Sequence, residues 1–363
     1  MRARMMVVTA LAAVLFTLGG TAFGQGAHAP WPTDWDNWQD PALWVTVGNP
    51  GNAPDMRYAT PGYGAVAYEY RIGKFEVTAG QYTAFLNAVA DTDTYGLYNG
   101  DMWASNYGCK IERTGEDRSY SYSVASDWAN RPVNFVSWGD AARFSNWLTN
   151  GQPMGAQGLG TTETGSYLLN GATTDAELIA VMREPDARYV VPGEDEWYKA
   201  AYHKNDDETG NYFNYPTGND AIPSNDRIDP DPGNNATFHL VGDYTIGEPY
   251  FRTEAGEHEA SPSPYGTFDQ GGNIYEWNEE VLSGAYRVLR GGSFVEDDDN
   301  LLVTVRAPDN LPTDEYYNIG FRVAEVPEPA SLALLVLGGA GMLLRRPFGR
   351  TGGKPFGRGR VVL

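Results

Sequence analysis

The stretch RVLRGGSFVEDDDNLL, residues 287–302, is the most informative part of this sequence, and it joins two contrasting halves. Its first half is a basic, strand-like segment that ends in Gly291, Gly292 and Ser293. Two adjacent glycines permit a backbone turn that is closed to residues with a Cβ atom. The second half contains a block of four acids at residues 296–299. The first half therefore predicts a rigid turn, while the acids allow three interpretations: a catalytic group, a cation site or a solvated loop.

The composition around this stretch predicts one loop-rich globular domain. Hydrophobic residues make up 42% of the chain and aromatic residues 13%, which is enough for a packed core. The 43 glycines and 23 prolines indicate many turns rather than a helical bundle. We expect one continuous domain over residues 43–325, because no linker-like tract interrupts it.

The order of predicted elements gives the fold class, which is α+β. Helices are expected after the N-cap Thr78, after a strand that ends at Val136, and around Asp195, whose charge favours a helix N-terminus. Residues 91–130 and 205–264 are expected to be loops. Short strands and tight turns make up the last part of the domain.

The N-terminus has the pattern of a secretory signal peptide. Residues 1–24 contain Arg2 and Arg4, then an apolar run, then a small-x-small sequence that ends at Gly24. Such a run is too short for a membrane-spanning helix and is typical of a segment that is removed on export. We therefore expect the mature protein to be exported.

The C-terminus has a second targeting pattern. Residues 326–346 contain VPEP, a short apolar run and the pair Arg345–Arg346, an order that resembles the PEP-CTERM sorting signal. The resemblance implies transient membrane retention through a short transmembrane segment, then cleavage by an exosortase-type machinery and transfer to the cell surface or extracellular matrix. Residues 347–363 add a basic tail that such signals usually lack. An ordinary C-terminal membrane anchor is the alternative.

The charge of the chain limits its partners. The formal net charge is −21, and residues 1–24 and 345–363 hold eight of the 26 basic residues and none of the 47 acidic ones. The part between them is therefore even more acidic than the whole chain. This excludes nucleic acid as a natural partner by repulsion and favours cations, or it serves solubility in a salty medium.

Six segments of the domain carry a family resemblance. They are YRIGKFEVTAGQYTAFLNAVA (70–90), RPVNFVSWGDAARFSNWL (131–148), YVVPGEDEWYKAAY (189–202), GTFDQGGNIYEW (266–277), YRVLRGGSF (286–294) and NIGFRVA (318–324). In order and spacing they resemble the formylglycine-generating enzyme, or sulfatase-modifying factor, family. The resemblance implies a variant of the C-type lectin-like fold, with little regular secondary structure and with its terminal strands paired.

Several residues of these segments are expected to be structural. Large amphipathic side chains pin loop-rich cores, and four tryptophans fit this role: Trp138, Trp147, Trp197 and Trp277. Arg290 and Arg322 are expected to bridge carbonyls or carboxylates of different segments.

The catalytic site of the family is the point where this sequence departs from the pattern. The resemblance implies oxidation of a sulfatase cysteine to formylglycine by copper, which two cysteines hold after the RGGS turn. Aligning RGGSF places these positions at Glu296 and Leu301, so that Ser293, Glu296 and Leu301 mark a degenerate copper site. Cu(I) needs soft thiolate ligands, and neither a carboxylate nor a leucine is one. We therefore expect no copper and no catalytic residue there.

The remaining thiol and imidazole groups do not replace this site. Cys109 is the only cysteine, so the chain forms no internal disulfide and no two-thiolate metal site. A sister branch of the fold uses a three-histidine iron site. The four histidines here lack its HxxHxE spacing: His28, His203, His239 and His258. We therefore expect no iron.

A calcium site is the metal centre that the resemblance does imply. The segment FDQGGNIYEW matches the family's binding loop with Asp269, Glu276 and the carbonyls of Gly272 and Ile274. Hard oxygen ligands of this kind suit Ca²⁺. The alternative is a turn in which Asp269 is a cap and Glu276 pairs with an arginine.

A second calcium site of the family is matched only weakly. It would need ligands from the loop that contains Asn235 and Asp243, where the alignment becomes uncertain.

Two functions follow from these observations. The first is a non-catalytic, calcium-stabilised binding or scaffolding module, whose aromatic loop TYGLYNGDMWASNYG (94–108) contacts an extracellular polysaccharide or a surface protein through its rings. The alternative for this loop is hydrophobic cover over the core. The second function is a formylglycine-generating-type oxidase or another metal-dependent oxidoreductase on the same fold.

Overall fold

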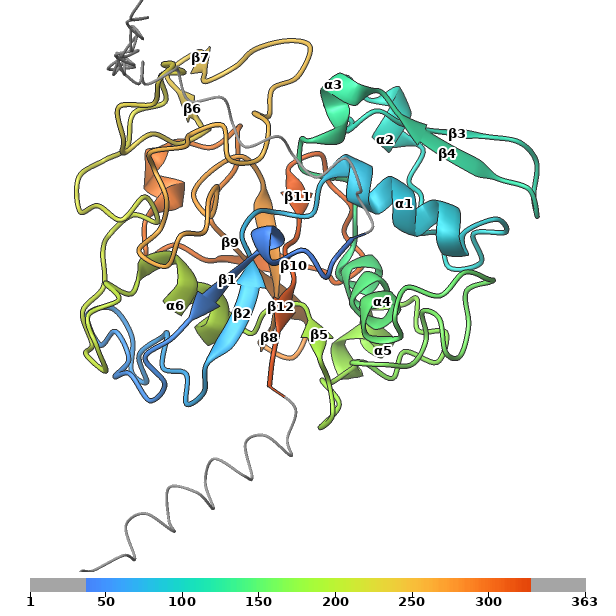
Figure 1. The fold of residues 1–363 in the computed structure, drawn as a ribbon, viewed down its shortest axis with the longest axis horizontal. Coiled ribbons are helices and arrows are strands. Elements are labelled where there is room, and N and C mark those ends of the chain that lie inside the picture. The colour runs from blue at the N-terminus through green and yellow to red at the C-terminus, as the bar shows by residue number, and fades with distance from the viewer. Residues whose placement is uncertain (1–36, 328–363) are drawn as a thin grey trace, which may run out of the picture.

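The computed structural model describes residues 37–327. The predicted signal peptide at 1–24, the basic tail at 347–363 and nearly all of the sorting segment at 326–346 lie outside this range. Within it the chain forms short helices and strands that long loops connect (Figure 1). This confirms the α+β, loop-rich fold class.

The helical elements are short. They are α1 (Ala79–Val89), α2 (Asp101–Ala104), α3 (Ser126–Ala129), α4 (Trp138–Thr149), α5 (Asp175–Ala180), α6 (Glu194–Tyr202) and the 3-10 turns η1 (Pro41–Leu43) and η2 (Asp298–Leu301). The strands are β1 (Trp44–Val47), β2 (Tyr70–Gly73), β3 (Ile111–Thr114), β4 (Ser121–Val124), β5 (Tyr189–Val190), β6 (His239–Leu240), β7 (Asp243–Tyr244), β8 (Tyr275–Leu282), β9 (Tyr286–Arg290), β10 (Ala307–Asn310), β11 (Ile319–Gly320) and β12 (Ala324–Glu325).

The first and last parts of the domain meet in one sheet. Its strand order is β1-β2-β12-β5, and all pairs are antiparallel. Ala324 of β12 lies opposite Ile72 of β2 on one side and Val190 of β5 on the other. The last strand, β12, is therefore an inner strand of the sheet that contains the first strand, β1, but β2 lies between the two and they do not pair directly.

A second sheet carries the glycine-paired turn of the RGGSF segment. Its order is β10-β9-β8-β11, in which β8 and β9 form a hairpin and β11 runs parallel to β8. In the view of Figure 1, α1, α4 and α5 lie to one side of these strands and α6 lies to the other. The RGGSF turn directly follows β9, so this sheet fixes its position.

Capping boxes start the two helices that pack on the core. Thr78 accepts a hydrogen bond from the backbone of Gln81, and the Gln81 side chain accepts one from the backbone of Thr78. Ser137 and Asp140 form the same reciprocal pair at the start of α4. Each box satisfies backbone N–H groups that a helix start leaves without partners. The predicted N-cap at Thr78 is therefore confirmed.

Two expectations about local structure are wrong. Residues 91–130 contain α2, α3 and the β3–β4 hairpin, whose strands are too short for their alternation to stand out in the sequence. The segment before α4 is buried but forms no strand, and Pro132 makes only an isolated bridge with Thr78. Proline lacks the N–H that a sheet ladder requires. The long loop at 205–264 is confirmed, with only the small β6–β7 hairpin in it.

The predicted structural residues take their expected places. The four tryptophans are at most 2% exposed: Trp138, Trp147, Trp197 and Trp277. Arg290 donates to the Glu194 carboxylate and to the carbonyls of Val303 and Val305. Arg322 donates to a carboxylate and to the carbonyls of segments far apart in the sequence.

Candidate functional site

The RGGSF turn positions the segment where the family's copper ligands would lie. Gly291 and Gly292 have φ values of 100° and 74°, which side chains rarely tolerate. A Cβ at Gly291 would lie 2.7 Å from the carbonyl oxygen of Gln270. Arg290 holds the preceding strand through a buried ion pair with Glu194, with 2.6 Å between Nη2 and Oε1. The turn is therefore fixed on both sides.

Glu296 is the residue that the alignment of RGGSF predicts at the first thiolate position. Its carboxyl accepts hydrogen bonds from the Ser293 hydroxyl and, at 3.3 Å, from the Asn318 side-chain amide. Burial raises the pKa of Glu296, and the nearby Asp297 adds to this. This position thus holds a hard, hydrogen-bonded carboxyl group.

Leu301, which the alignment predicts at the second thiolate position, belongs to the core. Its side chain is fully buried and packs in a small cluster with Tyr215, Ala236 and Phe238. The other three acids of the block, residues 297–299, lie between these two positions, and Asp297 accepts a hydrogen bond of 2.8 Å from the Asn300 side chain. The second position therefore presents hydrocarbon rather than a metal ligand.

Aromatic rings pack beside Glu296. The ring of Tyr107 lies 4.7 Å from that of Phe251 and 5.1 Å from that of Tyr317, between centroids. Phe294, directly after Ser293, lies 5.9 Å from Tyr107. These rings come from segments far apart in sequence, so only the fold brings them together next to the turn.

The aromatic loop at 94–108 has two roles in the structure. Leu97 and Met102 are fully buried and cover the core, whereas Trp103 is 47% exposed. Tyr107 is half-buried in the ring cluster beside Phe294. Part of the loop is therefore structural, and part of it presents rings to the outside.

The single thiol lies elsewhere in the core. Cys109 is fully buried, and this burial raises its pKa, although Asn134 and Arg252 oppose the shift. A buried thiol with a raised pKa is a poor nucleophile and a poor metal ligand.

The predicted calcium loop brings its residues together, but Glu276 is engaged by protein groups. Arg322 donates to both Glu276 oxygens, at 2.5 and 2.6 Å, and both side chains are fully buried. Trp197 donates its indole N–H to the same carboxylate at 2.7 Å. The Gly272 carbonyl accepts a hydrogen bond from Ile274.

Two further carboxyls lie near this pair. Asp269 accepts a hydrogen bond of 2.5 Å from the backbone of Gly256, and burial together with Glu276 raises the pKa of Asp269 to about 6. Burial and Asp269 likewise raise the pKa of Glu76 well above its ordinary value. Three carboxyls thus face the one guanidinium of Arg322.

Some oxygens of this cluster have no hydrogen-bond partner. Asn273 donates to one Glu76 oxygen at 3.2 Å, while the other Glu76 oxygen and the Asn273 amide oxygen are buried without a partner. Neither residue was singled out in the sequence, because Glu76 lies about 200 positions away from the loop that it approaches. The donors are all oxygens, which a hard cation such as Ca²⁺ prefers, but both Glu276 oxygens already accept from Arg322.

The two residues of the second predicted calcium site have different surroundings. Asn235 is buried and donates to Asp231 at 2.7 Å, while Asp243 is exposed in the β6–β7 hairpin. Asp231 also accepts from Gly233 and Ser261. Burial alone would raise the pKa of Asp231, but these hydrogen bonds lower it. Asp231 is thus a structural centre of the long loop.

Within residues 37–327, no group of three or more His, Cys, Asp or Glu side chains is arranged to hold a metal ion. In the same range, no helix is both long and apolar enough to cross a membrane.

Comparison with known families gives two matches. Residues 43–326 match the model of the sulfatase-modifying factor enzyme 1-like domain, and residues 325–346 match the PEP-CTERM protein-sorting motif. No curated protein matches the chain.

Among solved structures, the chain is similar to CarF with a TM-score of 0.51 and 20% identity, over 78% of this chain and 98% of that one. It also resembles Treponema denticola variable protein 1 (TM-score 0.47, 19% identity, 78% and 95% covered). A third similar structure is PvdO from Pseudomonas aeruginosa (TM-score 0.40, 18% identity, 78% and 91% covered). At these identities the likeness to CarF supports the fold alone.

Proposed function

We propose that this protein, which belongs to the sulfatase-modifying factor enzyme 1-like family, is a non-catalytic binding or scaffolding module displayed at the cell surface. Its PEP-CTERM motif indicates export, surface sorting and recognition by exosortase machinery. A signal peptide at 1–24 and transient anchoring through residues 326–346 belong to the same proposal.

The observation that supports this function is the chemistry at the two thiolate positions. Glu296 is a carboxyl held by Ser293 and Asn318, and Leu301 is a buried hydrocarbon. Copper chemistry of the family requires two soft ligands within reach of one ion. A carboxyl and a leucine supply neither, so retention of the fold is better explained by binding than by oxidation.

The rings beside Glu296 suggest what is bound. Tyr107, Phe251 and Tyr317 form a cluster next to Phe294, close in sequence to the positions that the alignment matches with the copper ligands. Aromatic faces next to a hydrogen-bonding carboxyl suit a polysaccharide or a surface protein segment, because both offer apolar patches beside polar groups. We propose an extracellular ligand of this kind at this cluster.

Calcium is proposed as a stabilising ion at the loop that contains Asp269. Three carboxyls and two buried, unpartnered oxygens support it, since a divalent cation would offset the excess charge that Arg322 leaves uncompensated. The ligands would be Asp269, the carbonyls of Gly272 and Ile274, and Glu276 shared with Arg322. Asn235 and Asp243 are retained only as residues of a proposed second site.

Metal content and peptide oxidation test the function. The full chain is purified and its copper, iron and calcium are measured, and it is co-expressed with a sulfatase peptide whose cysteine is followed by mass spectrometry. We expect copper and iron far below one equivalent and an unmodified cysteine. One equivalent of copper or iron, or conversion of the cysteine to formylglycine, would establish the competing oxidoreductase function instead.

A further inference from the structure

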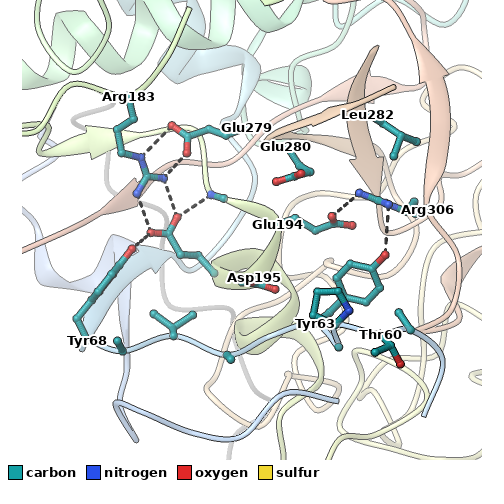
Figure 2. A pocket seen from close by; sticks show the side chains of 18 residues that line it. Thr60, Tyr63, Tyr68, Arg183, Glu194, Asp195, Glu279, Glu280, Leu282 and Arg306 are labelled. Carbon is teal, nitrogen blue, oxygen red and sulfur yellow. Dashed lines mark hydrogen bonds and ion pairs between the residues drawn. The ribbon is translucent and has the colours of Figure 1, made fainter. Parts of the chain in front are cut away.

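A cavity of about 670 Å³ lies away from the RGGSF turn, and none of its lining residues belongs to the ring cluster described above. It is bounded by residues 59–68, by the first turn of α6, by the end of β8 and by Arg306 (Figure 2). Its volume is that of a site for a small organic ligand rather than for a bare ion.

One wall of the cavity contains several small apolar residues. It is formed by the segment between β1 and β2, with Ala59, Pro61, Gly62, Ala65, Val66 and Ala67. The same segment also lines the cavity with Thr60, Tyr63 and Tyr68. The wall therefore combines small apolar residues with two aromatic rings, along which the aliphatic part of a ligand can lie.

The opposite wall holds carboxylates that are mostly paired with arginines. Arg183 donates to both oxygens of Glu196 at 2.8 Å, and it pairs with Glu279 at 2.7 Å. Glu194 pairs with Arg306 at 2.6 Å and with Arg290 at 2.6 Å. Three carboxylates are therefore balanced by three guanidinium groups, which leaves this framework neutral.

Two carboxyls remain outside this balance. Asp195 accepts a hydrogen bond of 2.8 Å from the backbone of Gly64, and neither it nor Glu280 forms an ion pair among the residues that the structure describes. Figure 2 shows Asp195 and Glu280 between the Arg183 cluster and the Glu194–Arg306 pair. Partial burial raises the pKa of both groups, and repulsion from Glu194 adds to it. Within the described part of the chain, the cavity thus carries two acidic groups that no ion pair offsets.

We propose that this cavity binds an alkylammonium group, that is, a primary amine on an aliphatic stem. The ammonium donates to Asp195 and Glu280, while the stem lies along the wall that contains Ala65 and Ala67. Both carboxyls are exposed to solvent. A neutral sugar would bring no opposite charge to them, and a metal ion would leave the apolar wall unused. The amine is that of a free aliphatic polyamine or of a lysine side chain, which share this chemistry. The site does not depend on the function proposed above.

Calorimetric titration of the full chain tests the proposal. Spermidine and Nα-acetyl-lysine amide are the two probes, and glucose and calcium chloride are the competitors. We expect an amine to bind, and Asp195→Asn and Glu280→Gln each to weaken it at least about tenfold, because each removes one charge-assisted contact. The amide introduced by Asp195→Asn keeps an oxygen that can accept from Gly64. Glu116→Gln is the matched control, since Glu116 is exposed and does not line the cavity.

The outcomes separate the two amine sources from an empty cavity. Tighter binding of spermidine supports a free polyamine, and tighter binding of the lysine amide supports a partner's lysine. The proposal is overturned if neither amine binds, if glucose or calcium binds more tightly than either amine and loses that binding in the two cavity variants, or if Glu116→Gln weakens amine binding as much as those variants do. Thermal unfolding of each variant at the wild-type temperature confirms that the fold is intact.

Discussion

Gly291 is the residue at which backbone conformation and close packing combine. Its φ of 100° strains any L side chain, and a Cβ there would also lie 2.7 Å from the Gln270 carbonyl. Gly284, in the turn between β8 and β9, has a φ of 69° but open space around it. The two glycines therefore differ in packing and not in the sign of φ.

This difference gives a prediction for the free energy of unfolding. Gly284→Ala is expected to cost about 1 kcal/mol, the typical penalty for a left-handed side chain. Gly291→Ala is expected to cost about 3 kcal/mol or more, because the backbone of Gln270 cannot move aside as a flexible side chain would. Urea unfolding of the two variants measures both values. Equal losses would show that the close approach at Gly291 is relaxed at no cost.

Glu276 has one of the two partners that its sequence left open. The sequence offered calcium or an arginine as its partner, and the structure gives it Arg322 and Trp197. The arginine alone does not neutralise the cluster, because Asp269 and Glu76 approach the same guanidinium. The arginine pairing is therefore observed, and the cation stays a proposal beside it.

At the scale of elements, capping boxes decide where helices begin. Thr78 and Thr174 make the same reciprocal contacts, with Gln81 at α1 and with Glu177 at α5. Thr78 is fully buried, whereas Thr174 is exposed. Water can replace the second cap after substitution and cannot replace the first.

The two caps are expected to differ in their effect on stability. Thr78→Ala should reduce the free energy of unfolding by about 2 kcal/mol, since it leaves a buried N–H without a partner. Thr174→Ala should reduce it by about 0.5 kcal/mol, the value typical of solvated caps. Urea unfolding monitored by far-ultraviolet circular dichroism gives both numbers. A larger loss at Thr174 would contradict the role of burial.

At the scale of the whole molecule, the carboxyl cluster around Asp269 is linked to the long loop at 205–264. The loop contains little regular structure, and Asp269 reaches into it through the backbone of Gly256. An ion held at Asp269 would therefore tie the loop to the core. An ion that binds only the folded state stabilises it according to its concentration.

Chelation tests this link. We expect EDTA to lower the melting temperature of the full chain by several degrees and excess calcium chloride to restore it, because a ligand of the folded state alone is removed and returned. Asp269→Asn is expected to abolish the shift, while Asp243→Asn separates the proposed second site from the first. A melting curve that EDTA leaves unchanged would refute the calcium proposal.

The family and the fold class could be predicted from the amino-acid sequence, whereas the loss of the thiolate pair stays a prediction that depends on the alignment of RGGSF. These depend on local properties: glycines that permit a turn, tryptophans large enough to be anchors, and side chains that either are or are not soft ligands. The PEP-CTERM motif could likewise be predicted, because its Pro-Glu-Pro sequence, apolar run and basic pair follow one another directly along the chain. The β3–β4 hairpin was not, since four-residue strands carry too few alternations to be distinguished from a loop.

Which charges meet became visible only in the folded chain. Arg183 pairs with Glu196 and Glu279 from 13 and 96 positions away. Nothing in the sequence therefore showed that Asp195 and Glu280 would be left without an ion pair in one cavity of the described domain. The run of acids at 194–196 had only indicated a helix start. Ion pairing depends on the distance between charges in space. In a loop-rich fold the path of the chain sets these distances, and loops have no periodic sequence pattern from which that path could be predicted.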